Sequence, residues 1–351
     1  MQNLFDDKRI LVTGGTGSLG QVLTKRLLSG ENGLPESVTV LSRDEAKQHY
    51  MRLDFAEKST ATDEVIYENS KNRLRFRIGD MRDYSSVIAA LKDIDIVFSA
   101  AALKQVPSCE YAPWEAIRTN VEGAENLVRA IAEFNLPIET VVGISTDKAC
   151  KPVNVMGMTK AIQERVYIQG NLRAPHTRFI AARYGNVLAS RGSVVPLFLD
   201  QIAAGGPVTI TTTDMTRFLL TLDDSVDLIF AAVASAKPGE TYIPRCPSAK
   251  MTDLADFLID GRDIDVVVTG IRPGEKIHEA LLSEEEATRT VLGSEGYYAL
   301  LPMLPELASY PDNPALVGEY SSDTALMNTE ELGTFLKEKI PTIIGQRYLE
   351  S

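Results

Sequence analysis

The first residues that could perform chemistry form a glycine-rich segment near the N-terminus. Gly14, Gly17 and Gly20 follow a short apolar run with the spacing G-x-x-G-x-x-G. Glycine allows a tight turn and leaves room for a pyrophosphate at a helix N-terminus, where N–H groups and the dipole favour negative charge. A simple tight turn is the alternative. The position of the segment between a strand-like and a helix-like stretch favours a dinucleotide site made by Gly14, Thr16, Gly17, Ser18, Leu19 and Gly20.

The residues after the second apolar run indicate which nicotinamide cofactor is used. In a dinucleotide site an acidic side chain at this place binds the ribose 2′-hydroxyl, whereas an arginine neutralises a 2′-phosphate. Arg43, with Ser42 and Lys47 nearby, favours NADP. Asp44 comes next and keeps NAD open, and a solvated charged loop is the alternative to both.

Three later segments could complete the cofactor site. Asp80 and Met81 follow the third apolar run, where a carboxylate can accept a hydrogen bond from the adenine amino group. Asn120 is either a further contact or a buried helix-to-sheet hydrogen bond. After the fourth apolar run, small residues would let the main chain approach the cofactor. This segment contains Ala100, Ala101, Ala102 and Lys104.

An acidic and a basic side chain stand next to each other after the fifth apolar run. Asp147 and Lys148 follow Thr146 at the carboxyl end of an expected strand, where open α/β sheets bind ligands. Such a pair suits proton transfer to and from neighbouring atoms of one substrate. A surface ion pair that caps a helix is the alternative, and the surrounding Ser-Thr-Asp-Lys motif favours chemistry.

The elements that must position these residues alternate along the chain. Short apolar runs at residues 10–13, 38–41, 75–78, 94–98, 140–144 and 179–182 suit buried strands. Amphipathic stretches at residues 21–28, 84–91, 124–134 and 160–169 suit helices, and residues 56–71 fit a helix extension or a loop. The alternation predicts an α/β fold with a Rossmann-like, doubly wound parallel sheet.

The pattern changes near residue 192, where Pro and Gly interrupt it. We predict that residues 1–190 are mainly the NADP-binding domain and that residues 191–305 are mainly a smaller, discontinuous substrate-binding portion with interleaved elements. Residues 306–351 are expected to be a loosely attached C-terminal tail. Trp114, Met215 and Phe218 are expected in the core.

Composition excludes several classes of protein. The net charge of −12 over 351 residues argues against a broad surface for nucleic acid or an anionic membrane. The three cysteines and three histidines lack the spacing of a disulfide framework or a metal site. The sequence has no secretory signal pattern and no apolar run of about 20 residues that could cross a bilayer. We therefore expect a soluble, cytoplasmic protein without a metal ion.

Eight segments, taken in order, resemble one enzyme family. They are GGTGSLG, GDMRD, AAALKQVP, TNVEG, STDKA, MGMTK, RYGNVLASRGSV and IRPGEK. Together they are similar to the UDP-N-acetylglucosamine 4,6-dehydratases of bacterial polysaccharide biosynthesis, which belong to the extended short-chain dehydrogenase/reductase superfamily. The chain looks like the short, soluble branch of that family. Most of the chain, roughly residues 5–290, takes part in the resemblance.

The resemblance implies a closed hydride cycle on a UDP-sugar. NADP would oxidise C4, water would leave across C5 and C6, and the hydride would return to C6, with inversion at C5. It assigns Asp147 as the general acid and Lys148 as the C5 base. It also implies a homo-oligomer, either a dimer or a hexamer.

One motif departs from the superfamily. Most short-chain dehydrogenases have Tyr-x-x-x-Lys, in which the lysine lowers the pKa of the phenol and orients the nicotinamide ribose. Met156 stands at the tyrosine position and cannot titrate, while Lys160 keeps the ribose role. Some members of the resembled family also have methionine there. The base at C4 is then Asp147, Lys148, Lys160 or a water molecule held through Thr146.

The remaining motifs suit a uridine-diphosphate sugar. Arginine supplies charge and paired donors for a diphosphate, and other polar side chains can bind ribose or sugar hydroxyls. A single arginine is more often a solvated surface residue, so the prediction rests on the group. The predicted substrate-binding residues are Lys104, Asn186, Arg191, Ser193, Arg217, Arg272 and Glu275.

Two other functions stay open. An epimerase, or a dehydratase of different regiochemistry, could use the same scaffold and would not form a 4-keto-6-deoxy product. A non-catalytic dinucleotide-binding regulator would bind the cofactor but no nucleotide sugar. The adjacent Asp147 and Lys148 argue against the regulator.

Overall fold

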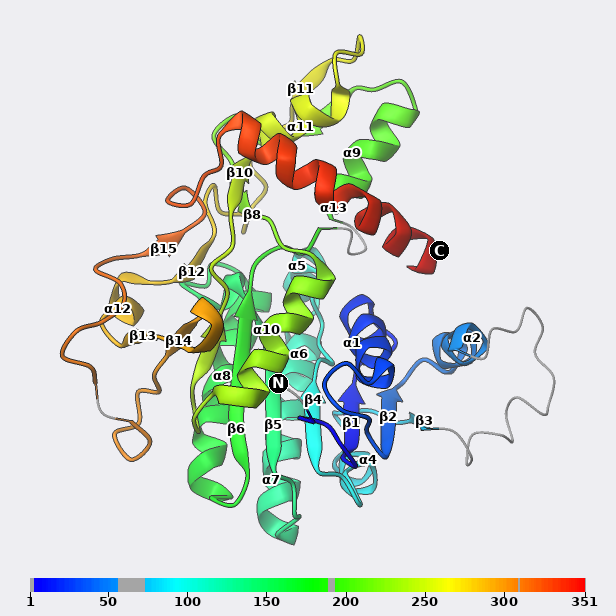
Figure 1. Cartoon of the computed structure of the whole chain (residues 1–351), viewed down its shortest axis with the longest axis vertical. Coiled ribbons are helices and arrows are strands. Elements are labelled where there is room, and N and C mark those ends of the chain that lie inside the picture. The colour runs from blue at the N-terminus through cyan, green and yellow to red at the C-terminus, as the bar shows by residue number, and fades with distance from the viewer. Residues whose placement is uncertain (1–2, 56–72, 189–192, 309, 351) are drawn as a thin grey trace.

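A nine-stranded sheet forms the centre of the fold (Figure 1). The computed structural model describes residues 3–55, 73–188, 193–308 and 310–350, so residues 56–71 lie outside the described part. The strands from β3 to β9 run parallel, and β14 and β13 add an antiparallel edge. In sheet order they are β13 (Thr290–Leu292), β14 (Tyr298–Leu300), β9 (Thr241–Ile243), β6 (Arg178–Tyr184), β5 (Thr140–Thr146), β4 (Ile96–Ser99), β1 (Arg9–Thr13), β2 (Ser37–Ser42) and β3 (Leu74–Ile78).

Helices cover both faces of this sheet. Successive side chains of a strand point to opposite faces. Accordingly, Ile10 and Val12 of β1 pack in one hydrophobic cluster and Leu11 packs in the other. The predicted doubly wound sheet is confirmed. The first face carries α1 (Ser18–Ser29) and α10 (Leu222–Ser235), the second carries α4 (Tyr84–Leu91), α7 (Gly123–Phe134) and α8 (Val155–Arg173), and α2 (Glu45–Phe55) follows β2.

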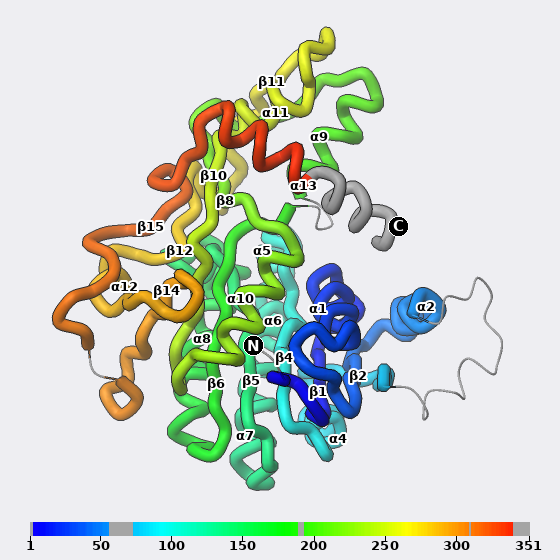
Figure 2. Tube along the Cα trace, in the orientation of Figure 1, coloured from blue at the N-terminus to red at the C-terminus, as the bar shows by residue number. Residues whose placement is uncertain are grey.

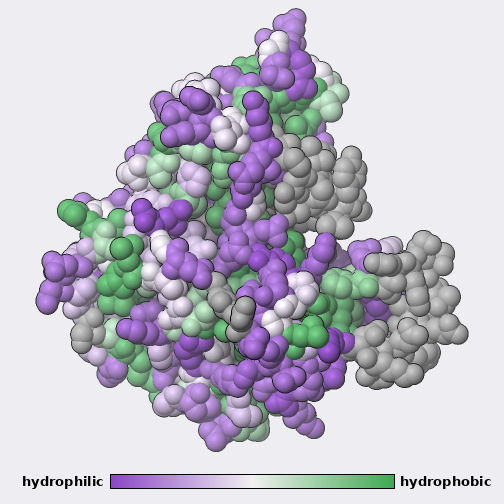
Figure 3. Space-filling model, in the orientation of Figure 1, coloured by the Kyte–Doolittle hydropathy of each residue, from purple (hydrophilic) through white to green (hydrophobic). Residues whose placement is uncertain are grey.

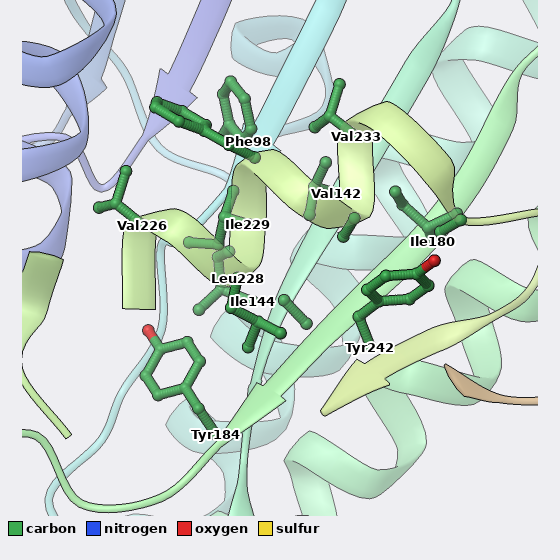
Figure 4. Close-up of a cluster of buried hydrophobic side chains, with 14 of the residues drawn as sticks. Phe98, Val142, Ile144, Ile180, Tyr184, Val226, Leu228, Ile229, Val233 and Tyr242 are labelled. Carbon is green, nitrogen blue, oxygen red and sulfur yellow. The ribbon is translucent and has the colours of Figure 1, made fainter. Parts of the chain in front are cut away.

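The cluster beneath α10 is the larger of the two. Val226, Ile229 and Val233 of the helix pack against strand residues such as Phe98 and Ile180 (Figure 4). Burial of a side chain of this size contributes about 1.5–3 kcal/mol. This face therefore holds the carboxyl ends of β4, β5 and β6 in place.

Three short helical segments lead from β4 into α7. They are α5 (Val106–Tyr111), α6 (Pro113–Ala116) and the π-helical segment η2 (Ile117–Glu122). Trp114 of α6 is 66% exposed, so its predicted place in the core is wrong. Met215 and Phe218 are buried as predicted.

A second hydrophobic core lies beyond the carboxyl ends of the strands, at the top of Figure 2. Phe198, Ile202, Leu254 and Leu258 are among its buried side chains. The chain enters this region after β6 and returns to the large sheet through β9, β14 and β13, so the two parts are interleaved. The division near residue 190 stays a prediction. The elements here are α9 (Val194–Ala203), the pair β7 (Val208–Ile210) and β11 (Val266–Val268), the pair β8 (Thr216–Phe218) and β10 (Ser248–Lys250), and α11 (Met251–Ile259).

The C-terminal segment is packed onto the rest of the chain. β15 (Tyr320–Ser321) pairs with β12 (Ala280–Leu282), and α12 (Glu284–Ala287) and the 3-10 turn η4 (Ser294–Gly296) lie between β12 and β14 in the chain. Leu332 and Leu336 of α13 (Thr329–Glu350) are buried in the second core. The prediction of a loosely attached tail is therefore wrong for residues 320–336, because strand pairing and apolar burial hold them on the rest of the chain.

The surface in Figure 3 is mostly hydrophilic, with hydrophobic residues in separate patches. None of the helices in the described part is both long and apolar enough to span a bilayer. Cys109, Cys150 and Cys246 are buried and form no disulfide.

Candidate active site

A cavity of about 570 Å³ lies at the carboxyl ends of β1, β4, β5 and β6. The starts of α9 and α10 close its other side, through Ser193 and Leu222. Open α/β sheets bind their ligands at this edge. The predicted site residues that line the cavity are Gly14, Thr16, Gly17, Ser18, Leu19, Gly20, Lys47, Ala100, Ala101, Ala102, Lys104, Thr146, Lys148, Met156, Lys160, Asn186 and Ser193.

The glycine loop is packed by main-chain contact. Gly14 has a positive φ of 65°, and a Cβ there would lie 2.8 Å from the main chain of Ala101. A Cβ on Gly20 would lie 2.4 Å from the Cα of Gly15. Gly17 precedes α1, and no side chain caps that helix. The N–H groups at the start of α1 therefore stay available for an anion.

The loop after β2 provides both a basic side chain and a helix cap. Ser42 Oγ lies 2.9 Å from Thr16 Oγ1, which joins this loop to the glycine segment. Asp44 accepts a hydrogen bond from the Lys47 main-chain N–H at 3.0 Å and pairs with the Lys47 ammonium at 3.1 Å. These contacts lower the pKa of Asp44. Arg43 is half exposed. Ser42, Arg43 and Asp44 do not line the cavity, and Asp44 already has partners.

Asp80 and Met81 are also away from the cavity lining. Asp80 is held by Arg82 through three side-chain hydrogen bonds and lies 3.6 Å from Arg43. Burial raises the pKa of Asp80, but its hydrogen bonds and charge contacts with Arg82 outweigh that effect and lower it. The Met81 side chain is buried in the hydrophobic cluster of the second sheet face. A contact of either residue with adenine stays a prediction.

Asn120 holds the loop that follows β4. Its side chain accepts from the Leu103 N–H at 2.8 Å and donates to the Leu103 carbonyl at 3.1 Å. It also donates to Thr159 Oγ1 of α8 at 3.0 Å. The structure thus supports the alternative of a buried structural hydrogen bond for Asn120.

Asp147 and Lys148 form an ion pair beside the cavity, in which Asp147 is buried and Lys148 is partly exposed. They lie in the 3-10 turn η3 (Asp147–Ala149), directly after β5. Lys148 Nζ lies 3.0 Å from Asp147 Oδ1 and 2.9 Å from Asn186 Oδ1. Thr146 Oγ1 donates to Asp147 Oδ1 at 2.8 Å. Thr146 and Lys148 line the cavity, whereas Asp147 is 1% exposed and does not. The pair is not a surface ion pair, and Asp147 contacts the cavity through its two neighbours.

Glu279 is a third charged group of this cluster that the sequence analysis missed. Its Oε1 lies 3.4 Å from Lys148 Nζ, and the residue is 3% exposed. Burial and the charge of Asp147 raise the pKa of Glu279, against the opposing effect of Lys148, Arg217 and Lys276. Burial would lower the pKa of Lys148, but Asp147 and Glu279 together raise it. In the sequence, Glu279 is marked only by its position directly before an apolar run. That position does not indicate where its side chain points.

Lys160 lies on α8 beneath the cavity. Its ammonium donates to the Ile144 carbonyl at 2.5 Å and also bonds Gln163 Oε1. Burial lowers the pKa of Lys160 to about 8, with partial compensation by Glu164. Met156 lines the cavity and packs among apolar residues. No titrating side chain therefore takes the place of the usual tyrosine in that motif.

Tyr184 is a cavity residue that was also missed. It lies at the end of β6, on the side of the sheet that α10 covers (Figure 4). It is 9% exposed, and among the described residues its hydroxyl has no hydrogen-bond partner. Burial raises the pKa of Tyr184, so the phenol is neutral. The other lining residues that the sequence analysis did not single out for the site are Gln21, Leu103, Gln105, Ile144, Ser145, Val187 and Leu222.

The predicted substrate-binding residues divide into two groups. Lys104, Asn186 and Ser193 line the cavity, and Ser193 Oγ is buried without a partner in the described part of the chain. The second group, which consists of the described residues Arg217, Arg272 and Glu275, does not line the cavity. Arg217 donates to the main-chain carbonyls of residues 216, 276 and 277.

Two further residues of that second group share one loop. Arg272 is exposed and lies 3.9 Å from Glu275. Both are away from the cavity lining. Arg191 lies outside the described residues. Substrate contacts of Arg191, Arg217, Arg272 and Glu275 stay predictions.

A buried ion-pair network supports the strand ends behind the site. Arg183 of β6 is 1% exposed and binds both Glu164 of α8 and Glu286 of α12. Ser145 of β5 donates to Glu164 at 2.5 Å. These bonds fix β5, β6 and α8 relative to one another, and with them the residues that the strands present to the cavity.

Comparison with known proteins identifies relatives that match this chain along most of its length. Residues 10–299 match the family described as "Polysaccharide biosynthesis protein". A UDP-N-acetylglucosamine 4,6-dehydratase (inverting) of Campylobacter jejuni is 41% identical over 86% of this chain and 85% of its own length. A UDP-glucose 4-epimerase of Rickettsia prowazekii is 40% identical over 95% of this chain and 96% of its own.

A solved structure extends the similarity to three dimensions. The X-ray structure of Pen from Bacillus thuringiensis is 32% identical and has a TM-score of 0.83. The alignment covers 95% of this chain and 98% of the other. The chain therefore belongs to the polysaccharide biosynthesis protein family, within the extended short-chain dehydrogenases/reductases that act as dehydratases and epimerases of nucleotide sugars.

Proposed function

We propose that this protein is an NADP-dependent UDP-N-acetylglucosamine 4,6-dehydratase that inverts C5. The observation that carries the proposal is the Asp147–Lys148 pair at the edge of the cavity, with the carboxylate buried and the ammonium facing the cavity. Elimination of water across C5 and C6 needs a base and an acid at adjacent carbons, and this pair supplies both. The relative of that name, 41% identical, supports the choice of substrate.

The nicotinamide cofactor would be held by the glycine loop. The main-chain contact between Gly14 and Ala101, and the uncapped start of α1, fit a pyrophosphate that approaches the backbone. Lys160 would bind the nicotinamide ribose, and Arg43 would pair with a 2′-phosphate. The cofactor supplies the hydride acceptor and donor of the cycle.

Two residues would move the proton of the C4 hydroxyl. Thr146 lines the cavity and donates a hydrogen bond to Asp147. Thr146 would accept the proton of the C4 hydroxyl and pass its own hydroxyl proton along this hydrogen bond to Asp147. Asp147 then carries a proton, which returns through Thr146 to the C6 hydroxyl, and that hydroxyl departs as water. Lys148 removes the C5 proton and later returns one to C5. The C4 proton thus leaves in the water molecule, and no further acid is needed.

Epimerisation at C4 is the second candidate. The relatives named UDP-glucose 4-epimerase match 95% of this chain at 40% identity. An epimerase returns the hydride to C4 and needs no acid or base at C5 and C6. An epimerase would still use Thr146 and Asp147 for the C4 proton, but it would leave Lys148 without a C5 proton to remove, which favours the dehydratase.

Incubation with UDP-N-acetylglucosamine and NADP in deuterated water, followed by proton NMR, tests the proposal. We expect a 4-keto-6-deoxy product with deuterium at C5 and no net consumption of cofactor. A C4 epimer that retains the C6 hydroxyl and has no deuterium at C5 would identify an epimerase. Unchanged sugar despite cofactor binding would contradict both candidates for this substrate.

Lys148→Arg tests the role of the base in the same assay. Arginine keeps the positive charge between the carboxylates but does not lose its proton at accessible pH. We expect deuterium incorporation at C5 to fall by about 10²-fold or more, the scale of general base catalysis. Lys151→Arg is the matched control, because Lys151 is exposed and pairs with Glu319 outside the cavity. Normal incorporation in Lys148→Arg would show that Lys148 is not the base.

A further inference from the structure

Lys148 cannot act as a base while it carries its proton. Its ammonium faces the carboxylates of Asp147 at 3.0 Å and Glu279 at 3.4 Å, which favour the protonated form. Arg217 is the other charged group near the lysine. Before C5 can be deprotonated, the proton of Lys148 must therefore move to another group.

A count of protons identifies that group. At the moment of C5 deprotonation the site must hold the proton from the C4 hydroxyl and the proton that Lys148 has released. Asp147 holds the first through Thr146. Among the described residues, the other carboxylate in contact with Lys148 is Glu279.

The surroundings of Glu279 suit a group that gains and loses a proton. Its Oε1 faces Lys148, while Oε2 is buried without a partner in the part of the chain that the structure describes. The facing charged groups are Asp147 and Lys148 of η3, Arg217 of β8 and Lys276 of its own segment. Burial without a full set of hydrogen bonds disfavours the ionised carboxylate.

Resting on the proposed dehydratase function, we propose that Glu279 is a positioning residue that stores the proton of Lys148 during catalysis. The ammonium of Lys148 transfers one proton to Oε1 of Glu279, which leaves a neutral amine and a neutral carboxylic acid. The amine then takes the C5 proton and later returns a proton to C5. Glu279 finally gives its proton back to Lys148, so the pair ends as it began.

Glu279→Gln tests this role through the pH profile of C5 deuterium incorporation. With Glu279, the proton moves inside the site, and we expect a rate that hardly changes between pH 7 and pH 9. With glutamine, Lys148 must lose its proton to solvent. We then expect the rate to fall below that of the unaltered protein at pH 7 and to rise by close to tenfold per pH unit.

Two further variants separate storage of a proton from support of the fold. Glu279→Asp keeps a carboxylate and should keep a flat profile at a reduced rate. Glu240→Gln is the control for amide replacement of a buried glutamate, since Glu240 is 5% exposed and does not line the cavity. Its rate should be unchanged at every pH.

The outcomes distinguish this inference from the proposed function. Parallel pH profiles for the unaltered protein and Glu279→Gln, whether equal or uniformly scaled, would overturn the role of Glu279 and leave the dehydratase intact. A rate that depends on pH in Glu279→Asp would also overturn the role of Glu279. This test holds even if Glu279→Gln fails to fold. Absence of C5 incorporation in the unaltered protein would overturn both proposals.

Discussion

Lys160 makes the stability of the folded protein depend on pH in a way that can be calculated. Burial lowers its pKa from 10.5 to about 8. Between these two values the unfolded chain binds more protons than the folded protein. The destabilisation of the folded protein by the buried Lys160 is therefore largest below pH 8 and decreases as the pH rises. For this one site, linkage predicts that the free energy of unfolding increases by about 1.3 kcal/mol from pH 7 to pH 9.

Lys160→Met removes the titrating group at similar side-chain length. Urea unfolding of both proteins at pH 7, 8 and 9 gives the difference in unfolding free energy at each pH. Methionine leaves the Ile144 carbonyl and Gln163 without their donor, and that cost does not change with pH. We expect the difference to shift by about 1.3 kcal/mol in favour of the unaltered protein between pH 7 and pH 9.

The matched control for this prediction is Lys25→Met on α1, where the lysine is exposed. That variant should show a difference from the unaltered protein that is constant with pH. A constant difference for Lys160→Met as well would refute the reasoning, because it would mean that Lys160 keeps an ordinary pKa in the folded protein. A shift of the opposite sign would mean that the folded state favours its ammonium.

Two further predictions concern the ligands. Tyr184→Phe should leave the unfolding free energy of the free protein nearly unchanged, since the hydroxyl of this cavity residue has no hydrogen-bond partner among the described residues. The variant should bind NADP or UDP-sugar more weakly, as measured by calorimetry. A loss of stability together with normal binding would contradict this prediction. Arg43→Ala should weaken the binding of NADP by roughly 10-fold to 100-fold, the value of a charge-assisted contact. It should weaken the binding of NAD by much less. Equal losses for both cofactors would show that Arg43 does not select the 2′-phosphate.

Local pattern alone determined much of this molecule. The six predicted strands and four predicted helices all occur, because apolar runs and helical periodicity reflect which face of an element is buried. The glycine loop, Thr146 and Lys148 line the cavity, since each follows a strand, and parallel strands bring their carboxyl ends to one edge.

Tertiary structure decided the features that depend on residues far apart in the chain. Glu279 meets Lys148 because a segment more than a hundred residues later returns to the end of β5. Asp147 lies behind the cavity wall, and Trp114 lies on the surface, although neither position is visible in the local pattern. The C-terminal segment is packed onto the rest of the chain because Leu332 and Leu336 are buried in the second core. Composition and periodicity describe one element at a time, whereas burial, pKa and contact arise from the elements packed around it.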